Sequence, residues 1–250
     1  MIKQTKYTRD ELVKLDKHLE MIPLTFDKQF KKIFENNLDL LKKFLIITLK
    51  LPVTEEECNI VIDSKEQIKY NHKEYQMTFD ISVTLNEKTN VMVEMNSKYF
   101  KNIKERNSLY LDRKRISLVE QGENPEDYAD TYVYQLNLNP KEKNVTSGGH
   151  IIVPYDLTTN TVFTDNKIMV LKYLEYYRKL YYTYSNREEE VIWLTGLTSK
   201  TFTEVYDIYS QILTPEELEK LIEDVINMSK DFVSVHEWEK EKMDALVEYT

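Results

Sequence analysis

Hydrophobic and polar positions alternate strictly from residue 75 to residue 85, where every odd position is apolar or aromatic and every even one is polar. A period of two is typical of a half-buried strand. Val91, Val93 and Met95 continue the same parity in the next apolar stretch. Because the linker 86–90 is short, polar and bounded by asparagines, the pattern predicts an antiparallel hairpin.

The register of this hairpin decides which polar side chains meet. If Leu85 faces Val91, then Asp80 lies opposite Asn96, and Asp80 and Glu94 are diagonal neighbours on one face. Diagonal partners lie roughly 7–8 Å apart at the backbone, so two carboxylates that lean together can hold one divalent cation. The alternative is a solvated face that simply carries acids, and the spacing alone leaves both interpretations open.

The remaining pattern predicts an α/β (α+β) fold. A capping box opens a helix over 8–20, and Thr25 is expected to cap a long helix that ends before Pro52. The other expected elements are strands at 59–62, 65–70, 131–138 and 151–153 and a helix over 100–121. Together they give an α-β-β-β-α-β core with a mixed sheet flanked by helices.

We expect three parts along the chain. These are a lead-in helix over residues 1–24, a core over 25–166, and a helical, acidic C-terminal region over 167–250. The tyrosines of residues 173–184 favour a packing face, with base stacking as the alternative. Removing the residues from Thr214 onward is expected to leave a folded core without the seven net negative charges that repel phosphate.

Composition excludes several classes of protein. The 250 residues are 41% hydrophobic and 31% charged, and no apolar run approaches the roughly 20 residues that cross a bilayer. Four glycines form no phosphate-binding loop, and four scattered histidines do not suggest zinc. The lone Cys58 and the polar opening predict a reducing, cytoplasmic setting with no membrane partner.

Charge is unevenly distributed along the chain. The formal net charge is −9, and residues 214–250 alone carry −7. Residues 98–115 carry a local +5, which fits a surface for phosphates or an ordinary solvated helix face. The acidic end would repel DNA or attract a basic partner.

Four stretches in order resemble the PD-(D/E)XK nucleases, and most closely their recombination-promoting, transposase-like branch. Asp80 followed on the next strand by Glu94 and Asn96 resembles the Asp…Glu-x-Lys signature, with Asn at a position that is usually Lys, or Gln in this branch. The stretch 23–34 resembles the branch's opening Asp-x-x-Phe-Lys-x-x-Phe motif, the segment from Arg106 to Tyr110 its Arg-x-x-x-Tyr helix, and 131–138 its following strand.

The resemblance implies a restriction-endonuclease-like fold and a Mg²⁺-dependent endonuclease acting on DNA, with Mn²⁺ as a substitute. It implies catalytic residues Asp80, Glu94 and Asn96, and metal ligands Asp80, Glu94 and the Met95 backbone carbonyl. The supporting residues would be Asp27, Lys31, Arg106 and Tyr110, and the nucleic-acid contacts Lys98, Lys101, Lys104 and Arg113. Asp27 and Lys31 also fit a plain ion pair on the helix surface.

Two other readings stay open because Asn96 brings no charge. One is a non-catalytic protein with the nuclease fold, whose acidic C-terminal region binds a basic partner or mimics DNA. The other is a defence or toxin nuclease that is silent until triggered. The sequence leaves homodimer formation open.

Overall fold

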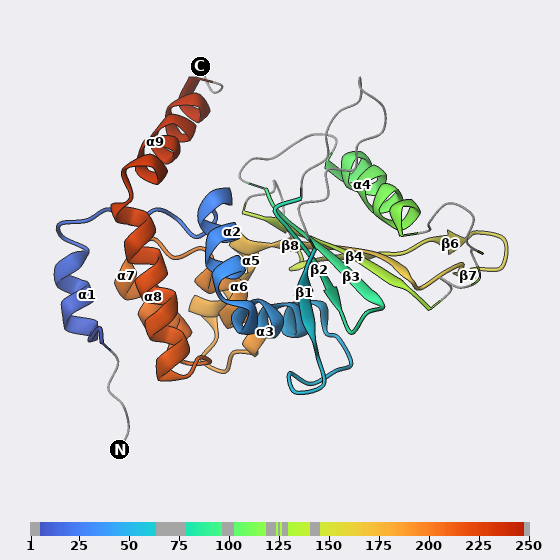
Figure 1. The fold of residues 1–250 in the computed structure, drawn as a ribbon, viewed down its shortest axis with the longest axis horizontal. Coiled ribbons are helices and arrows are strands. Elements are labelled where there is room, and N and C mark those ends of the chain that lie inside the picture. Colours follow the sequence, from blue (N-terminus) through green and yellow to red (C-terminus); the bar gives the residue numbers. More distant parts are fainter. Residues whose placement is uncertain are drawn as a thin grey trace. The chain divides into compact units, whose positions relative to one another are not determined.

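The computed structural model describes residues 6–63, 79–96, 103–118, 124, 126, 130–140 and 146–247. The chain divides into two compact units (Figure 1). The first, called here the helical unit, joins residues 1–48 to residues 174–250. The second, called here the sheet unit, comprises residues 49–173.

Among its described residues, the sheet unit has a main sheet of six strands in the order β1-β2-β3-β4-β8-β5. The pairs β3/β4 and β4/β8 are parallel and the others antiparallel, so the sheet is mixed as predicted. Its elements are β1 (Ile60–Ile62), β2 (Ile81–Leu85), β3 (Thr89–Met95), α4 (Ile103–Ser117), β4 (Tyr132–Asn139), β5 (Gly149–Ile152), β6 (Tyr155–Asp156), β7 (Thr161–Val162) and β8 (Lys167–Tyr173).

The two faces of the sheet differ in chemistry. Ile81, Val83, Val91 and Val93 belong to one face and are fully buried, which gives the sheet an apolar side. Positions of the opposite parity form the other face and carry Ser82, Thr84, Asn90, Glu94 and Asn96. Helix α4 packs on β4 and β8 and, as Figure 1 shows, lies across the sheet. We call the face that carries these residues the polar face. It lies under α4.

The predicted hairpin exists, but its register is shifted by two residues. Leu85 pairs with Thr89, not with Val91, and Ile81 pairs with Val93. The turn is shorter than expected because Asn86 and Glu87 both take the left-handed conformation, with φ of 48° and 64°. A shift by two keeps every side chain on its predicted face. The predicted first residues of the hairpin, 75–78, and the strand at 65–70 lie outside the described residues.

The first seven residues of the predicted C-terminal region, which begins at residue 167, belong to the sheet. Residues Lys167–Tyr173 form β8, an interior strand between β4 and β5. The helices begin only at Leu174. Gly149 permits the pairing of β5 with this strand, because a Cβ there would lie 1.8 Å from the carbonyl oxygen of Leu171.

The helical unit combines both ends of the chain. Its elements are α1 (Arg9–Leu15), α2 (Asp27–Asn36), α3 (Leu38–Leu49), α5 (Leu174–Thr183), α6 (Glu189–Gly196), α7 (Phe202–Tyr209), α8 (Pro215–Lys230) and α9 (Phe232–Val247). The capping box predicted at Thr8 is present, and a second one at Thr214 opens α8. Helix α8 packs on α2 and α7 through a buried apolar stripe, so the residues after Thr214 belong to the core of this unit.

The long helix expected from Thr25 onward is two helices. The N-cap of α2 is Phe26 and not Thr25, and Asn37 separates α2 from α3. The Asn37 amide donates to the Ile33 carbonyl at 2.7 Å and to the Asp224 carboxylate at 2.6 Å. This buried side chain satisfies the end of α2 and ties it to α8, which explains the break.

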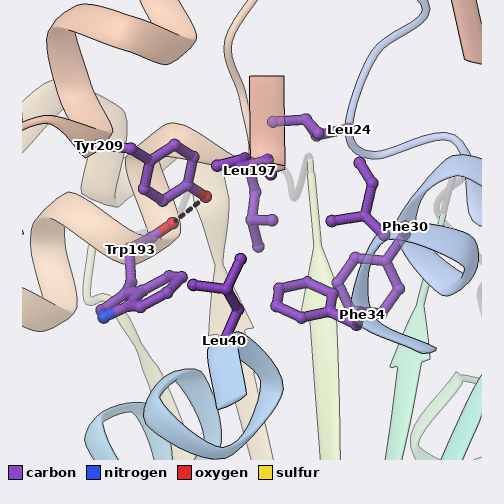
Figure 2. Close-up of a pocket in the computed structure, with 9 residues that line it drawn as sticks. Leu24, Phe30, Phe34, Leu40, Trp193, Leu197 and Tyr209 are labelled. Atoms are coloured by element: carbon purple, nitrogen blue, oxygen red, sulfur yellow. Dashed lines mark hydrogen bonds between the residues drawn. The ribbon is translucent and has the colours of Figure 1, made fainter. Parts of the chain in front are cut away.

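A small apolar cavity lies in the core of the helical unit (Figure 2). It is lined by Leu24, Phe30, Ile33, Phe34, Leu40, Trp193, Leu197, Tyr209 and Leu221. Its volume of ≈ 10 Å³ is about what one water molecule needs, and water also needs polar partners. The Tyr209 hydroxyl donates instead to the Trp193 carbonyl, at 3.1 Å, so the cavity is a gap in packing and not a substrate site.

The tyrosines of α5 are divided between core and surface, because Tyr182 is 60% exposed. Tyr177 and Tyr181 are buried. Arg178 donates to Thr198 at 2.9 Å and to Glu204 at 2.5 Å, and the Tyr182 hydroxyl donates to Glu204 at 2.6 Å. Because Arg178 is engaged within the unit, the alternative of a base-stacking surface loses one of its cations.

Candidate functional site

Asp80 and Glu94 come together where β2 begins and β3 ends. Continuing the observed register by one residue beyond Ile81 and Val93 puts Asp80 directly opposite Glu94, closer than the diagonal relation predicted from the sequence. The Asp80 Oδ2 atom accepts a hydrogen bond from the Met95 backbone N–H at 2.6 Å. Glu94 is only 7% exposed. The two carboxylates therefore belong to one local arrangement.

The Met95 backbone faces the same side as Asp80. The next residue, Asn96, donates its N–H in the other direction, to the Leu138 carbonyl of β4 at 2.9 Å. Because the N–H and C=O of one strand residue point to the same neighbour, the Met95 carbonyl lies on the β2 side with Asp80. Two carboxylates and a backbone carbonyl, all hard oxygen donors, thus gather at the end of β3.

Asn96 is held by two side chains. Its Oδ1 atom accepts a hydrogen bond from Arg106 Nη2 at 2.9 Å, and its Nδ2 atom donates to Asn139 Oδ1 at 3.2 Å. Asn96 is 3% exposed, and Arg106 lies on α4. The amide is therefore fixed in orientation, with a guanidinium against its oxygen.

Tyr110 lies one turn after Arg106 in α4 and contacts the residue before Asp80. Its ring meets the ring of Phe79, the residue before Asp80, edge to face at 5.6 Å between centroids. The Arg106 guanidinium carbon lies 5.6 Å from the centroid of the same Tyr110 ring. Arg106 and Tyr110, predicted as supporting residues, therefore link the two strands that carry Asp80 and Asn96.

A row of asparagines, which the sequence pattern did not single out, extends the site along β4. Asn107 of α4 donates to Asn137 at 2.5 Å, and the Asn139 amide donates to the Asn137 carbonyl at 3.2 Å. Asn137 pairs with Glu94 in the parallel ladder. The alternation of Gln135, Asn137 and Asn139 in a strand that follows the site is the signal that could have revealed them.

A second polar cluster on the same face was also missed. Asp63, just after β1, accepts hydrogen bonds from Ser82 at 2.6 Å, Thr84 at 2.8 Å and Lys114 at 3.1 Å. The Lys114 side chain is 3% exposed, so this is a buried ion pair supported by two hydroxyls. It anchors the far end of α4 to β1 and β2.

Several cations of the positive stretch 98–115 therefore make contacts inside the sheet unit. Arg106 and Lys114 are engaged as described, and Arg115 donates to the Asn166 carbonyl at 3.3 Å. Of the predicted nucleic-acid contacts, Lys104 is exposed and Arg113 half-buried. Lys98 and Lys101 lie outside the described residues.

Asp27 and Lys31 lie in α2 of the helical unit, and the site described above lies in the sheet unit. Asp27 is exposed in the first turn of α2, where a carboxylate favours the helix dipole. Their proposed support of the site stays a prediction.

Two further observations limit the chemistry of the described residues. Among residues 6–63, 79–96, 103–118, 124, 126, 130–140 and 146–247, no three His, Cys, Asp or Glu side chains cluster as a metal site. A site made of Asp80, Glu94 and a backbone carbonyl has only two such side chains, so it falls outside that criterion. In the same part of the chain, every helix is too short or too polar to span a bilayer.

The core has a mixed sheet and the element order α-β-β-β-α-β. Its two acids lie at the start of β2 and at the end of β3. These features are typical of the restriction-endonuclease-like class. The family model of the PD-(D/E)XK nuclease family transposases matches residues 24–247. The chain therefore belongs to that family. Comparisons with curated proteins and with solved structures give no match.

Proposed function

We propose that this protein is a metal-dependent endonuclease that hydrolyses phosphodiester bonds in DNA. The observation that carries the proposal is the hydrogen bond of 2.6 Å from Met95 N–H to Asp80, together with a register that, continued by one residue beyond Ile81 and Val93, puts Glu94 opposite Asp80. Membership of the PD-(D/E)XK family supports a nuclease acting on DNA, and nucleases of this kind generally use divalent metal ions.

The donor set fits a hard divalent cation. Asp80, Glu94 and the Met95 carbonyl would hold it through oxygen alone, which suits Mg²⁺ and admits Mn²⁺. Such an ion supplies positive charge for a phosphoryl oxygen and acidifies a bound water. The Met95 N–H keeps the Asp80 carboxylate turned toward the end of β3, and burial of Glu94 limits its other contacts with water.

Arg106 supplies the charge that Asn96 lacks. An amide at the third catalytic position orients a water or a phosphate oxygen but cannot neutralise charge. The Arg106 guanidinium, at 2.9 Å from Asn96 Oδ1, brings a permanent cation to that position. The Asn96–Arg106 pair would thus do together what one lysine does in most of the superfamily.

DNA would approach along α4. Lys98, Lys101, Lys104 and Arg113 remain the proposed phosphate contacts, whereas Lys114 is excluded because it is buried against Asp63. Each phosphate contact adds to affinity and to its salt dependence. Substituting Lys104 should therefore weaken binding most at low salt.

The second candidate function is a non-catalytic interaction protein. It is favoured by Asn96, whose amide is hydrogen-bonded at both ends within the protein. Its acidic surface is less available than the charge of −7 suggests, because acids of the C-terminal region pair with cations near the N-terminus. Glu217 pairs with Lys43 at 2.6 Å, and Glu223 with Lys6 at 2.8 Å.

Nicking of supercoiled plasmid with Mg²⁺ or Mn²⁺ separates the two functions. We expect the wild type to nick DNA, and Asp80→Asn and Glu94→Gln to lose at least about 100-fold in rate. Glu105→Gln, an exposed acid on α4, is the matched control and should retain activity. A folded wild type that cuts neither single- nor double-stranded DNA would favour the interaction protein.

A further inference from the structure

An unusual exposed apolar surface lies on the edge strand β5 and on the separate hairpin that follows it. It consists of β5 and the β6–β7 hairpin, called here the β5–β7 surface, and Figure 1 shows the hairpin projecting beyond the end of the sheet. Six large side chains on it are exposed: Ile151, Ile152, Tyr155, Leu157, Val162 and Phe163. Leu157 is 89% exposed and Phe163 77%.

The exposed area matches that of a protein contact. If each large apolar residue offers about 200 Å², the six together expose roughly 700 Å². Monomers rarely expose contiguous apolar patches of more than a few hundred Å². A standard interface buries about 800 Å² on each partner. The six side chains, distributed over β5 and the β6–β7 hairpin, therefore together expose about as much apolar area as one side of such an interface buries.

The β6–β7 hairpin also needs a surface to pack against in order to be stable. It has only two pairs of facing residues, Tyr155 with Val162 and Asp156 with Thr161. A two-stranded ribbon is marginally stable in water unless it packs on something. Tyr155 and Val162 share one face and Phe163 belongs to the other, so apolar groups occur on both faces.

The charge of the β5–β7 surface argues against nucleic acid as its binding partner. Residues 146–166 contain no lysine or arginine, and their two acids are Asp156 and Asp165. Phosphate contacts need cations, which this surface lacks. A neutral, apolar partner is the better fit.

The strand edge points to a second copy of the same chain. In the described part of the sheet, β5 is the last strand beyond β8, and its residues His150, Ile151 and Ile152 are all exposed. Natural edge strands are usually protected by charge, proline or a bulge, and within β5 there is neither a charged residue nor a proline. An edge of this kind pairs with its own copy in an antiparallel, self-complementary contact about a twofold axis.

We propose that the protein forms a homodimer in which two β5 edges pair antiparallel and the β6–β7 hairpins cover apolar surface of the partner. The contact joins two six-stranded sheets into one continuous sheet. It goes beyond the proposed nuclease function and does not depend on it.

Sedimentation equilibrium of the full chain tests the proposal. The wild type should have twice the mass of one chain at about 10 µM. Ile151→Lys puts two like charges at the edge and should weaken the dimer by roughly 100-fold or more, because a symmetric contact meets each substitution twice. Val61→Lys, at the similarly exposed strand β1 on the other side of the sheet, is the matched control and should remain dimeric.

A cross-link provides a second readout that does not require loss of a contact. Cys58 is buried, so Ile151→Cys introduces an exposed thiol that should form a disulfide between copies under mild oxidation, whereas Val61→Cys should not. A monomeric wild type at about 100 µM would overturn the proposal. A dimer that survives Ile151→Lys would overturn it as well.

Discussion

The guanidinium of Arg106 donates a hydrogen bond of 2.9 Å to the side-chain oxygen of Asn96. The two residues come from different elements, α4 and the end of β3, and meet beside the carboxylate pair. Position 96, which is usually a lysine in the superfamily, therefore has the cation Arg106 within one hydrogen bond. This contact changes what a substitution at Asn96 should do.

Replacing Asn96 with lysine should not by itself raise the rate of nicking. Asn96→Lys places a second cation against Arg106, and like charges at this distance repel. We expect nicking to rise only in the double variant Asn96→Lys with Arg106→Gln, while Arg106→Gln alone loses about 10²–10³-fold. Plasmid nicking rates measure this. Equal activity of Arg106→Gln and wild type would remove Arg106 from the site.

The buried pair of Lys114 and Asp63 should matter for stability and not for chemistry. Lys114→Met leaves a buried carboxylate without its cation, which costs about 3 kcal/mol or more in the free energy of unfolding. The double variant Lys114→Met with Asp63→Asn should recover much of that loss. Urea unfolding followed by circular dichroism measures both. If the single variant unfolds like the wild type, the ion pair contributes nothing to the fold.

Truncation before Thr214 should unfold the helical unit instead of releasing a tail. It removes Leu221, Ile222 and Val225, which are buried in the core between α2, α7 and α8. Losing several buried apolar side chains costs far more than a domain's net stability. Limited proteolysis should therefore cut the truncated chain rapidly within residues 6–48. A protease-resistant truncated chain would mean that α8 is dispensable.

Acid should weaken the helical unit partly through Glu204. Burial alone would raise the pKa of this carboxyl, but hydrogen bonds from Tyr182, the Lys200 N–H and Arg178 outweigh it, so the pKa is lowered. A lowered folded-state pKa gives stability that is present above the ordinary value of 4.5 and is lost as pH falls through the folded-state pKa.

The pKa of Tyr182 is raised to about 12, first because the hydroxyl is partly buried and second because it donates to the Glu204 carboxylate. Thermal unfolding between about pH 6 and pH 3 tests the acid prediction. The melting temperature of Glu204→Gln should fall less steeply with pH than that of the wild type. Identical slopes for the two proteins would contradict the role of Glu204.

Alternation of side chains identified the hairpin and both of its faces, but not its register. The shorter turn depends on Glu87 in a left-handed conformation, which glutamate rarely adopts and which no sequence pattern indicates. Because the error is two residues, Asp80 and Glu94 still share a face, and they come closer than predicted.

The strand β8 was missed for a different reason. Its residues Ile168 to Leu171 form a continuous apolar run, since an interior parallel strand is buried on both faces and does not alternate. Contacts between distant elements were also invisible in the sequence. Asn107 and Lys114 gain their roles only when α4 packs against the sheet, where they reach Asn137 and Asp63.

Calorimetric titration of the folded protein with Mn²⁺ tests the proposed site most directly. We expect one binding site in the wild type and in the control Glu105→Gln, and none in Asp80→Asn or Glu94→Gln. Asp80→Asn is the sharper variant, because its amide oxygen can still accept the Met95 N–H while the charge is lost. A wild type that binds no Mn²⁺ at millimolar concentration, or binding that survives in Asp80→Asn, would contradict the account.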